Sequence, residues 1–211
     1  MTNSTIARIG FTGVGLFIAT TILGGLQMEN YSHVSQLISE SYAIGTPYGE
    51  WLRFVGFIPS GICIFLFSVL AIRQVPKAGN TSIAFTGLGL FYGLGTVLVS
   101  IFPCDKGCET DLIDPGISQL IHNLSGMLTY LIVPVCLIVL GNTARSWPNA
   151  RTVSTTGIIS GTTAIIFVAL LTINIHSPYV GFYQRIVEGS ILLFILITAS
   201  YLQQEERPSV R

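Results

Sequence analysis

Long apolar stretches alternate with short polar segments along the whole chain. Six of these stretches come close to the roughly 20 residues that an α-helix needs to cross a bilayer. Because lipid offers no hydrogen-bond partners, a segment inside it must pair its own backbone groups, as an α-helix does. The alternating pattern of a membrane β-strand is absent. The predicted spans are Ile9–Leu26, Phe54–Ile72, Ser82–Phe102, Ser118–Gly141, Val153–Ile173 and Gln184–Tyr201.

The connections between these spans are too short to hold a separate soluble domain. We therefore expect one all-α domain over residues 1–211, an integral membrane six-helix bundle. Composition agrees, because only 9% of the residues are charged, against about 25% in soluble proteins, and mean hydropathy is +0.68. The net charge is zero and no phosphate-binding glycine loop occurs, so we expect the lipid bilayer, and no nucleic acid, as a partner.

Charged residues are sorted between the two sides of the predicted bundle. Eight of the ten acids lie in the first and third gaps or just past the fifth: Glu29, Glu40, Glu50, Asp105, Glu109, Asp111, Asp114 and Glu188. Basic residues near span ends mark the cytoplasmic side. Seven lie opposite the acids and three beside them: Arg8, Arg73, Lys77, Arg145, Arg151, Arg207 and Arg211 against Arg53, Lys106 and Arg185. We therefore expect both termini in the cytoplasm and the odd-numbered gaps on the outer face.

Two cysteines, Cys104 and Cys108, share the third gap. On the outer face they meet an oxidising compartment, where disulfides persist. The sequence therefore predicts a disulfide between them. A metal site is the weaker interpretation, because no second Cys or His pair lies at zinc-binding spacing.

The first outer loop carries helical spacing from Tyr31 to Tyr42. Its apolar residues share one face, and His33, Gln36 and Glu40 share another. This pattern predicts a short helix at the membrane interface. Its polar face either meets solvent or turns inward to a site.

The fourth span follows Asp114, a residue type that favours the N-cap position of a helix. Polar side chains then recur at intervals of three or four along one side of this span: Ser118, His122, Ser125 and Thr129. A lone histidine at this level is often only hydrogen-bonded in packing. Here the accompanying hydroxyl groups favour a polar cavity between helices that His122 faces.

The sixth span opens with Arg185 and Glu188, which are three residues apart. Side chains at this spacing can pair along a helix, so a structural ion pair is one interpretation. The other is a functional site, because an ionisable residue below the membrane surface is costly and usually faces the bundle interior. Glu50 and Arg53 repeat the spacing at the second span, where we favour the structural interpretation.

A family resemblance rests on several segments in order. They are Tyr31 to Glu40, then Trp51 ahead of a glycine-containing span, then Phe102 to Asp105, Ile121 to Asn123, and Gln184 with Arg185. In order and placement these segments resemble the domain-of-unknown-function 998 family of small prokaryotic membrane proteins, over roughly Ile9 to Tyr201. The resemblance implies a six-span architecture and the plasma membrane of a prokaryote. It implies no reaction, substrate or cofactor.

Three function classes follow from the polar outer end. The first is a protein that binds or transports a lipid headgroup or small polar ligand. Its candidate residues are His33, Glu40, Arg53, Asp105, His122, Arg185 and Glu188. The second is an enzyme at the outer leaflet, working by acid and base groups or by a metal. If that metal is zinc, its ligands would be His33, His122, His176 and Asp105. The third is an assembly protein that has no small-molecule site.

Overall fold

The chain forms a bundle of helices. The computed structural model describes residues 1–108 and 114–205, and within these ranges six helical segments are long and apolar enough to cross a membrane. They are Asn3–Leu26, Gly49–Ala71, Thr81–Ile101, Ile117–Ser146, Arg151–Ile173 and Val180–Glu205. No strand occurs among the described residues. The prediction of an all-α membrane protein with six spans is confirmed.

Some spans comprise several helical elements in succession. In chain order these are α1 (Asn3–Leu26), η1 (Ser39–Tyr42), α2 (Gly49–Trp51), η2 (Leu52–Phe57), α3 (Ile58–Ala71), α4 (Thr81–Gly87), η3 (Leu88–Leu94), α5 (Gly95–Ile101), α6 (Ile117–Thr143), η4 (Ala144–Ser146), α7 (Arg151–Ile173) and α8 (Val180–Glu205). Elements η2 and η3 are π-helical turns inside the second and third spans, whereas η1 and η4 are 3-10 helices. Such π-turns are frequent at functional sites.

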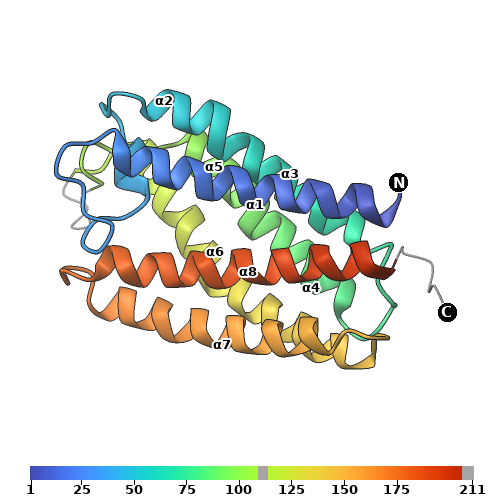
Figure 1. The fold of residues 1–211 in the computed structure, drawn as a ribbon. Coiled ribbons are helices and arrows are strands. Elements are labelled where there is room, and N and C mark those ends of the chain that lie inside the picture. Colours follow the sequence, from blue (N-terminus) through green and yellow to red (C-terminus); the bar gives the residue numbers. More distant parts are fainter. Residues whose placement is uncertain (109–113, 206–211) are drawn as a thin grey trace.

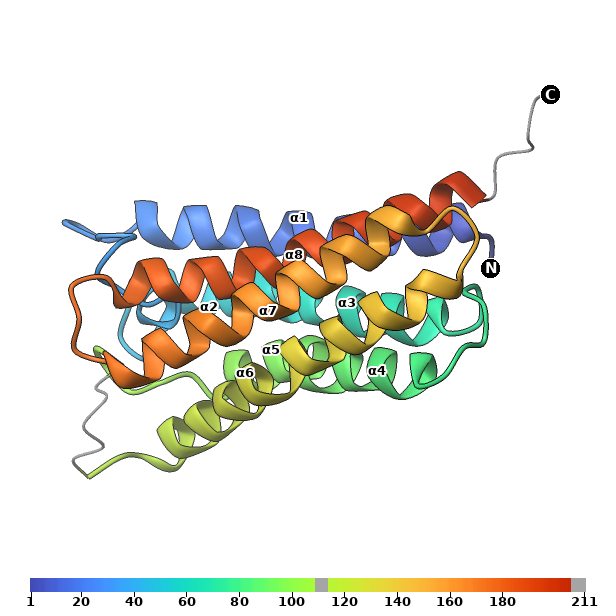
Figure 2. The same ribbon diagram turned by 90° about the horizontal axis from the view of Figure 1, so that it is seen from below.

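The six spans form a closed ring in which each span contacts its two neighbours. Helix α8 packs against α7 and α1, α1 against α3, α3 against η3, and the third span against α6, which returns to α7. Figures 1 and 2 show that α1 begins and α8 ends at the same end of the bundle. We call the opposite end, formed by residues 27–48, 102–108, 114–116 and 174–179, the loop end.

Helix α6 crosses the ring diagonally. Figure 1 shows α6 close to α7 near the end where α1 begins and far from α7 at the loop end. Glycines permit the close approach: a Cβ on Gly157 would lie 2.7 Å from the Gly141 Cα, and one on Gly161 would lie 2.6 Å from the Pro134 carbonyl oxygen. Small residues allow such backbone contact between membrane helices. The crossing therefore closes the bundle at one end and separates α6 from α7 at the other.

The start of α6 differs from the prediction. Asp114 has φ of +52°, whereas an N-cap residue requires an extended backbone. Gly116 has that backbone, with φ −63° and ψ 157°, and it is the N-cap of α6. The prediction of Asp114 as the N-cap is wrong because its backbone is left-handed.

The first loop is less helical than its spacing suggested. Within Tyr31–Tyr42 the chain forms turns, followed by the short 3-10 helix η1. The predicted position of this segment at a membrane interface stays a prediction. Of the charged residues counted above, Glu109, Asp111, Arg207 and Arg211 lie outside the described residues.

We predict that Gly157→Ala lowers the free energy of unfolding by about 1–3 kcal/mol, because the new methyl group would meet backbone atoms that cannot move aside. The control is Gly15→Ala on α1, where a Cβ meets nothing within 4 Å. That variant should keep its stability or gain up to about 1 kcal/mol from better helix propensity. Unfolding in detergent, followed by circular dichroism, measures both. Equal stability of the two variants would show that α6 and α7 do not meet at this glycine.

Candidate functional site

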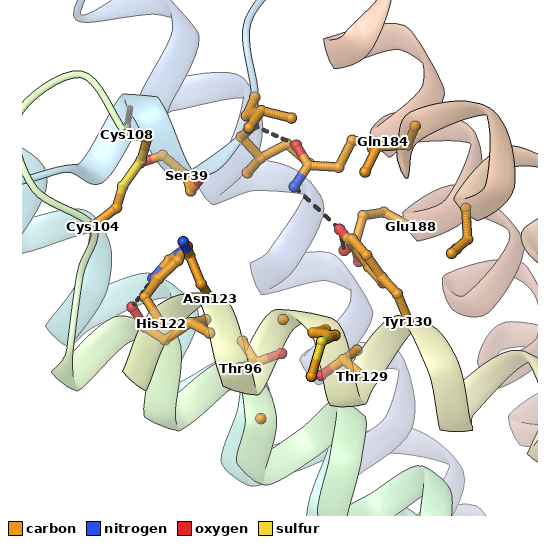
Figure 3. Close-up of a pocket in the computed structure, with 18 of the residues that line it drawn as sticks. Ser39, Thr96, Cys104, Cys108, His122, Asn123, Thr129, Tyr130, Gln184 and Glu188 are labelled. Carbon is orange, nitrogen blue, oxygen red and sulfur yellow. Dashed lines mark hydrogen bonds between the residues drawn. A yellow bond between two sulfur atoms is a disulfide. The ribbon is translucent and has the colours of Figure 1, made fainter. Parts of the chain in front are cut away.

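A cavity of about 560 Å³ lies inside the bundle at its loop end. Side chains from the first loop, both π-turns, α5, α6, α7 and α8 line it. The cavity has a polar wall, drawn in Figure 3, and an apolar wall. The buried carboxyl group of Glu188 belongs to the polar wall.

The polar wall is built around a chain of hydrogen bonds that begins in the first loop. The Ile38 backbone N–H donates to Gln184 Oε1 at 2.7 Å. Because an N–H can only donate, this contact fixes the Gln184 amide with its nitrogen on the other side. Gln184 Nε2 then donates to the Tyr130 hydroxyl at 3.1 Å, and that hydroxyl donates to Glu188 Oε1 at 2.8 Å.

A second tyrosine completes the surroundings of Glu188. The Tyr92 hydroxyl, from the π-turn η3, donates to Glu188 Oε2 at 2.8 Å. Glu188 itself is 8% exposed. Each carboxylate oxygen thus accepts one hydrogen bond from a phenol hydroxyl, and each keeps a further lone pair. The carboxylate lies at the boundary of the cavity, with α6, α8 and η3 all holding it in place.

Arg185 and Glu188 do not form an ion pair, although both belong to the described part of the chain. Arg185 Nη1 donates to the Gln36 carbonyl oxygen at 2.7 Å and to the Gly181 carbonyl oxygen at 3.0 Å. Its Nη2 donates to the Tyr31 hydroxyl at 2.8 Å. The structural ion pair considered from the sequence is therefore absent, because the guanidinium turns toward the first loop.

Arg185 instead fastens the first loop to α8. The Tyr31 hydroxyl that accepts from Arg185 donates in turn to the Leu37 carbonyl oxygen at 2.7 Å, and the Phe182 N–H donates to the Val34 carbonyl oxygen at 2.9 Å. Burial raises the pKa of Tyr31, while the Arg185 charge opposes that effect. The loop is thereby held over the cavity as one of its walls.

His122 lies in the polar wall on α6. Its Nδ1 is 3.1 Å from the Phe102 carbonyl oxygen and 3.2 Å from the Val99 carbonyl oxygen. Both partners only accept, so Nδ1 carries the proton, and in the neutral ring Nε2 is left as an acceptor. His122 thus anchors α6 to the end of α5 while presenting its edge to the cavity.

Further polar groups line the same wall without a hydrogen-bond partner among the described residues. Ser39 Oγ and the Tyr42 hydroxyl come from η1, and Asn123 Nδ2 comes from α6. Burial raises the pKa of Tyr42, and the Glu188 charge raises it further, which is consistent with both groups facing one cavity. Each of these groups can form a hydrogen bond to a further partner without adding charge.

The disulfide predicted between Cys104 and Cys108 is present, and both sulfur-bearing residues line the cavity (Figure 3). It lies against the first loop: the Ile44 N–H donates to the Cys104 carbonyl oxygen at 3.0 Å. This hydrogen bond ties the third loop to the first. The predicted disulfide is confirmed.

The apolar wall lies between α6 and α7 in their halves nearest the loop end. Met127 and Leu131 of α6 line the cavity and yet are 52% and 58% exposed. Val168, Leu171 and Thr172 of α7 line the opposite side, together with Ile175 just after the end of this helix. The cavity is therefore continuous with the lateral surface of the bundle between these helices. In a membrane that surface faces lipid.

The structure brings two of the seven candidate residues, His122 and Glu188, to the cavity wall. Glu40 and Asp105 hold the loops: Glu40 accepts from the Leu37 N–H at 2.7 Å, and Asp105 Oδ2 accepts from the Gly116 N–H at 2.8 Å. Arg53 lies in the second span, where its Nε donates to the Gly49 carbonyl oxygen of the same span at 3.2 Å. His33 is exposed and packs edge-on against the Tyr31 ring, with the ring centroids 5.1 Å apart.

The described residues do not form the ligand cluster that the zinc hypothesis requires. Over residues 1–108 and 114–205, no three His, Cys, Asp or Glu side chains are grouped so that they could hold a metal. The set His33, His122, His176 and Asp105 is therefore not assembled as a metal site.

Sequence reasoning missed the groups that surround Glu188. Tyr92 and Tyr130 lie inside spans, and Gln184 lies at the start of one. The signal was present, because a phenol deep in a span needs a hydrogen-bond partner when it is buried. The choice of partner could not be read from the sequence, since it depends on how α6 crosses the ring.

Fold and cavity together define a six-span helical membrane protein with an amphipathic cavity at one end of its bundle. The family model described as a protein of unknown function (DUF998) matches residues 11–201. The chain therefore belongs to this family, as the order of its motifs suggested. A search of curated proteins and a search of solved structures each give no match.

We predict that alkylation of the denatured, unreduced protein adds two alkyl groups and that alkylation after reduction adds four. The chain has four cysteines, of which Cys63 and Cys136 are free and Cys104 and Cys108 are bonded. Mass spectrometry of the intact protein counts the groups. Four additions before reduction would contradict the disulfide. The variant Cys104→Ser/Cys108→Ser is the control and should take up two groups with or without reductant.

Proposed function

We propose that this protein binds a membrane lipid, which enters the cavity sideways between α6 and α7. One observation supports this most directly: a cavity whose inner wall is polar opens onto the lateral surface through exposed apolar residues, Met127 and Leu131. An amphiphile matches both walls, because its headgroup meets the polar one and its chains meet the apolar one. A fully polar solute would match only the first.

The size of the cavity favours partial entry of the lipid. About 560 Å³ lies within the roughly 300–1,000 Å³ that is usual for small-molecule sites. It accommodates a headgroup and the first part of the chains, and the chains then continue into the bilayer. The lipid need not leave the membrane, so its chains stay in an apolar surrounding throughout.

Binding fits the fold better than passage through the membrane. Beyond the cavity, α6 and α7 meet through the backbones of Gly141 and Gly157. This contact leaves no room for a headgroup between the two helices toward the end where α1 begins. The cluster of polar groups at the loop end therefore serves one face of the membrane.

We place that face on the outside of a prokaryotic plasma membrane, with both termini in the cytoplasm. The support is the distribution of basic residues near span ends, which favours the end opposite the cavity. A disulfide at the loop end agrees, because disulfides persist in oxidising compartments.

We predict that alkaline phosphatase fused to the C-terminus is inactive and that green fluorescent protein fused there is fluorescent, since the first folds only outside the cytoplasm and the second inside. Fusions within 174–179 should give the opposite result. An active phosphatase at the C-terminus would overturn this orientation.

We predict that the purified protein in detergent binds acyl-chain-labelled phosphatidylethanolamine saturably, and that Gly126→Phe weakens this binding about tenfold or more. Gly126 lines the cavity, and a Cβ there meets nothing within 4 Å, so the new ring fills the cavity without disturbing the fold. The loss corresponds to at least about 1.4 kcal/mol. Fluorescence titration measures it.

The matched control is Gly15→Phe on α1, where a Cβ also meets nothing within 4 Å but which does not line this cavity. This variant should bind the labelled lipid as the unchanged protein does. Lipid binding that never saturates, or that Gly126→Phe leaves intact, would contradict the proposed function.

A further inference from the structure

We propose that the cavity recognises an ammonium group, which the Glu188 carboxylate binds as a charge-assisted hydrogen-bond acceptor. The proposal rests on the proposed function for its lipid and adds the chemical class of the headgroup. It is carried by the direction of the hydrogen bonds around Glu188, by the lack of an ion pair to Glu188 among the described residues, and by its position at the cavity wall.

The direction of the hydrogen bonds shows that Glu188 is held as an acceptor. The chain of hydrogen bonds starts at the Ile38 N–H, which can only donate. It passes through Gln184 and Tyr130 toward the carboxylate. Tyr92 donates to the second oxygen. Two donors aimed at one carboxyl group favour its ionised form, which only accepts.

Within the described part of the chain, no cation of the protein neutralises this carboxylate. Across residues 1–108 and 114–205, no Lys, Arg or His forms an ion pair with Glu188, and the two nearby arginines are engaged elsewhere. Arg185 donates to the first loop and to the Gly181 carbonyl oxygen. Arg53 donates to the Gly49 carbonyl oxygen. A buried charge without a counterion is costly in a membrane, so a cationic ligand would gain what the protein does not supply.

The remaining geometry suits a group with N–H donors. Each Glu188 oxygen accepts one hydrogen bond from a tyrosine and keeps a further lone pair for a ligand. The rings of Tyr42 and Tyr92 line the same cavity, and phenol faces attract cations. The His122 Nε2 and the Ser39 hydroxyl add uncharged acceptors along the wall. An alcohol headgroup could use these uncharged groups but would leave the carboxylate without a counterion.

An ammonium group has two sources, the aminoethyl headgroup of a lipid and a free amine in solution. The apolar opening between α6 and α7 favours the lipid. Phosphatidylethanolamine and phosphatidylglycerol differ in this respect: the first carries an ammonium group and the second a diol, on the same glycerophosphate. Acyl-chain-labelled forms of these two lipids, and free ethanolamine, are therefore the probes.

The experiment titrates the detergent-solubilised full chain, unchanged and as Glu188→Gln, with each labelled lipid. The unchanged protein should bind phosphatidylethanolamine about tenfold or more tightly than phosphatidylglycerol, as expected for a charge-assisted hydrogen bond. Glu188→Gln keeps the side-chain shape and removes the charge. It should weaken phosphatidylethanolamine binding by a similar factor, leave phosphatidylglycerol binding unchanged or tighter, and abolish the preference.

Tyr130→Phe is the second variant, because it removes a hydroxyl from the same carboxylate and leaves the charge in place. Its preference for phosphatidylethanolamine should persist even if both affinities fall. If Tyr130→Phe loses the preference as completely as Glu188→Gln does, the preference follows the packing of the wall and the proposal is overturned.

The outcomes separate this proposal from the proposed function. Equal, saturable binding of both lipids that Gly126→Phe abolishes would overturn the ammonium site and keep the lipid site. Glu188-dependent binding of ethanolamine without saturable lipid binding would support the ammonium site and overturn the lipid. Absence of saturable binding for all three probes would overturn both.

Discussion

The hydrogen-bond chain from Ile38 through Gln184 and Tyr130 to Glu188 connects segments that lie far apart in the sequence. It joins the first loop, α8 and α6, and Tyr92 adds the third span. In a bilayer such groups have no water to turn to, so each must find its partner inside the protein. The chain therefore sets how these elements meet around the cavity, and it leaves a carboxylate at its end.

The shape of the cavity has a different origin. Glycines at the contact of α6 with α7 bring the two backbones together on one side of the membrane. The diagonal course of α6 then separates the helices at the loop end, where Met127 and Leu131 remain exposed. The same pair of helices, α6 and α7, thus forms a close backbone contact at one end and an open cleft at the other. Arg185 holds the first loop, and the disulfide holds the third loop. Both loops close the cavity at the loop end.

Hydropathy alone located all six spans, because membrane thickness fixes how long an apolar helix must be. It placed the starts less well: the second span begins at Gly49 and includes the charged Glu50 and Arg53, which the search for apolar residues passed over. The disulfide could also be predicted, because Cys104 and Cys108 share one gap and that gap was expected to face an oxidising compartment. These features depend on local sequence or on the solvent, and both are visible without a fold.

The wall of the cavity depends on contacts between distant segments, and the sequence could not supply them. Spacing allowed Arg185 to pair with Glu188, yet Arg185 turns to Gln36, which is 149 residues away in the chain. Tyr92 and Tyr130 lie inside the third and fourth spans, and no spacing in the sequence links either of them to Glu188. Only the course of α6 across the ring shows that both phenols meet one carboxylate.

Recognition of an ammonium group requires a charged Glu188, and infrared difference spectroscopy tests this charge directly. The spectrum of the unchanged protein in lipid at neutral pH, minus that of Glu188→Gln, isolates the vibrations of this one group. We predict the paired stretching bands of an ionised carboxylate, shifted by hydrogen bonds from two phenols. The carbonyl band of a protonated carboxylic acid in their place would contradict the account.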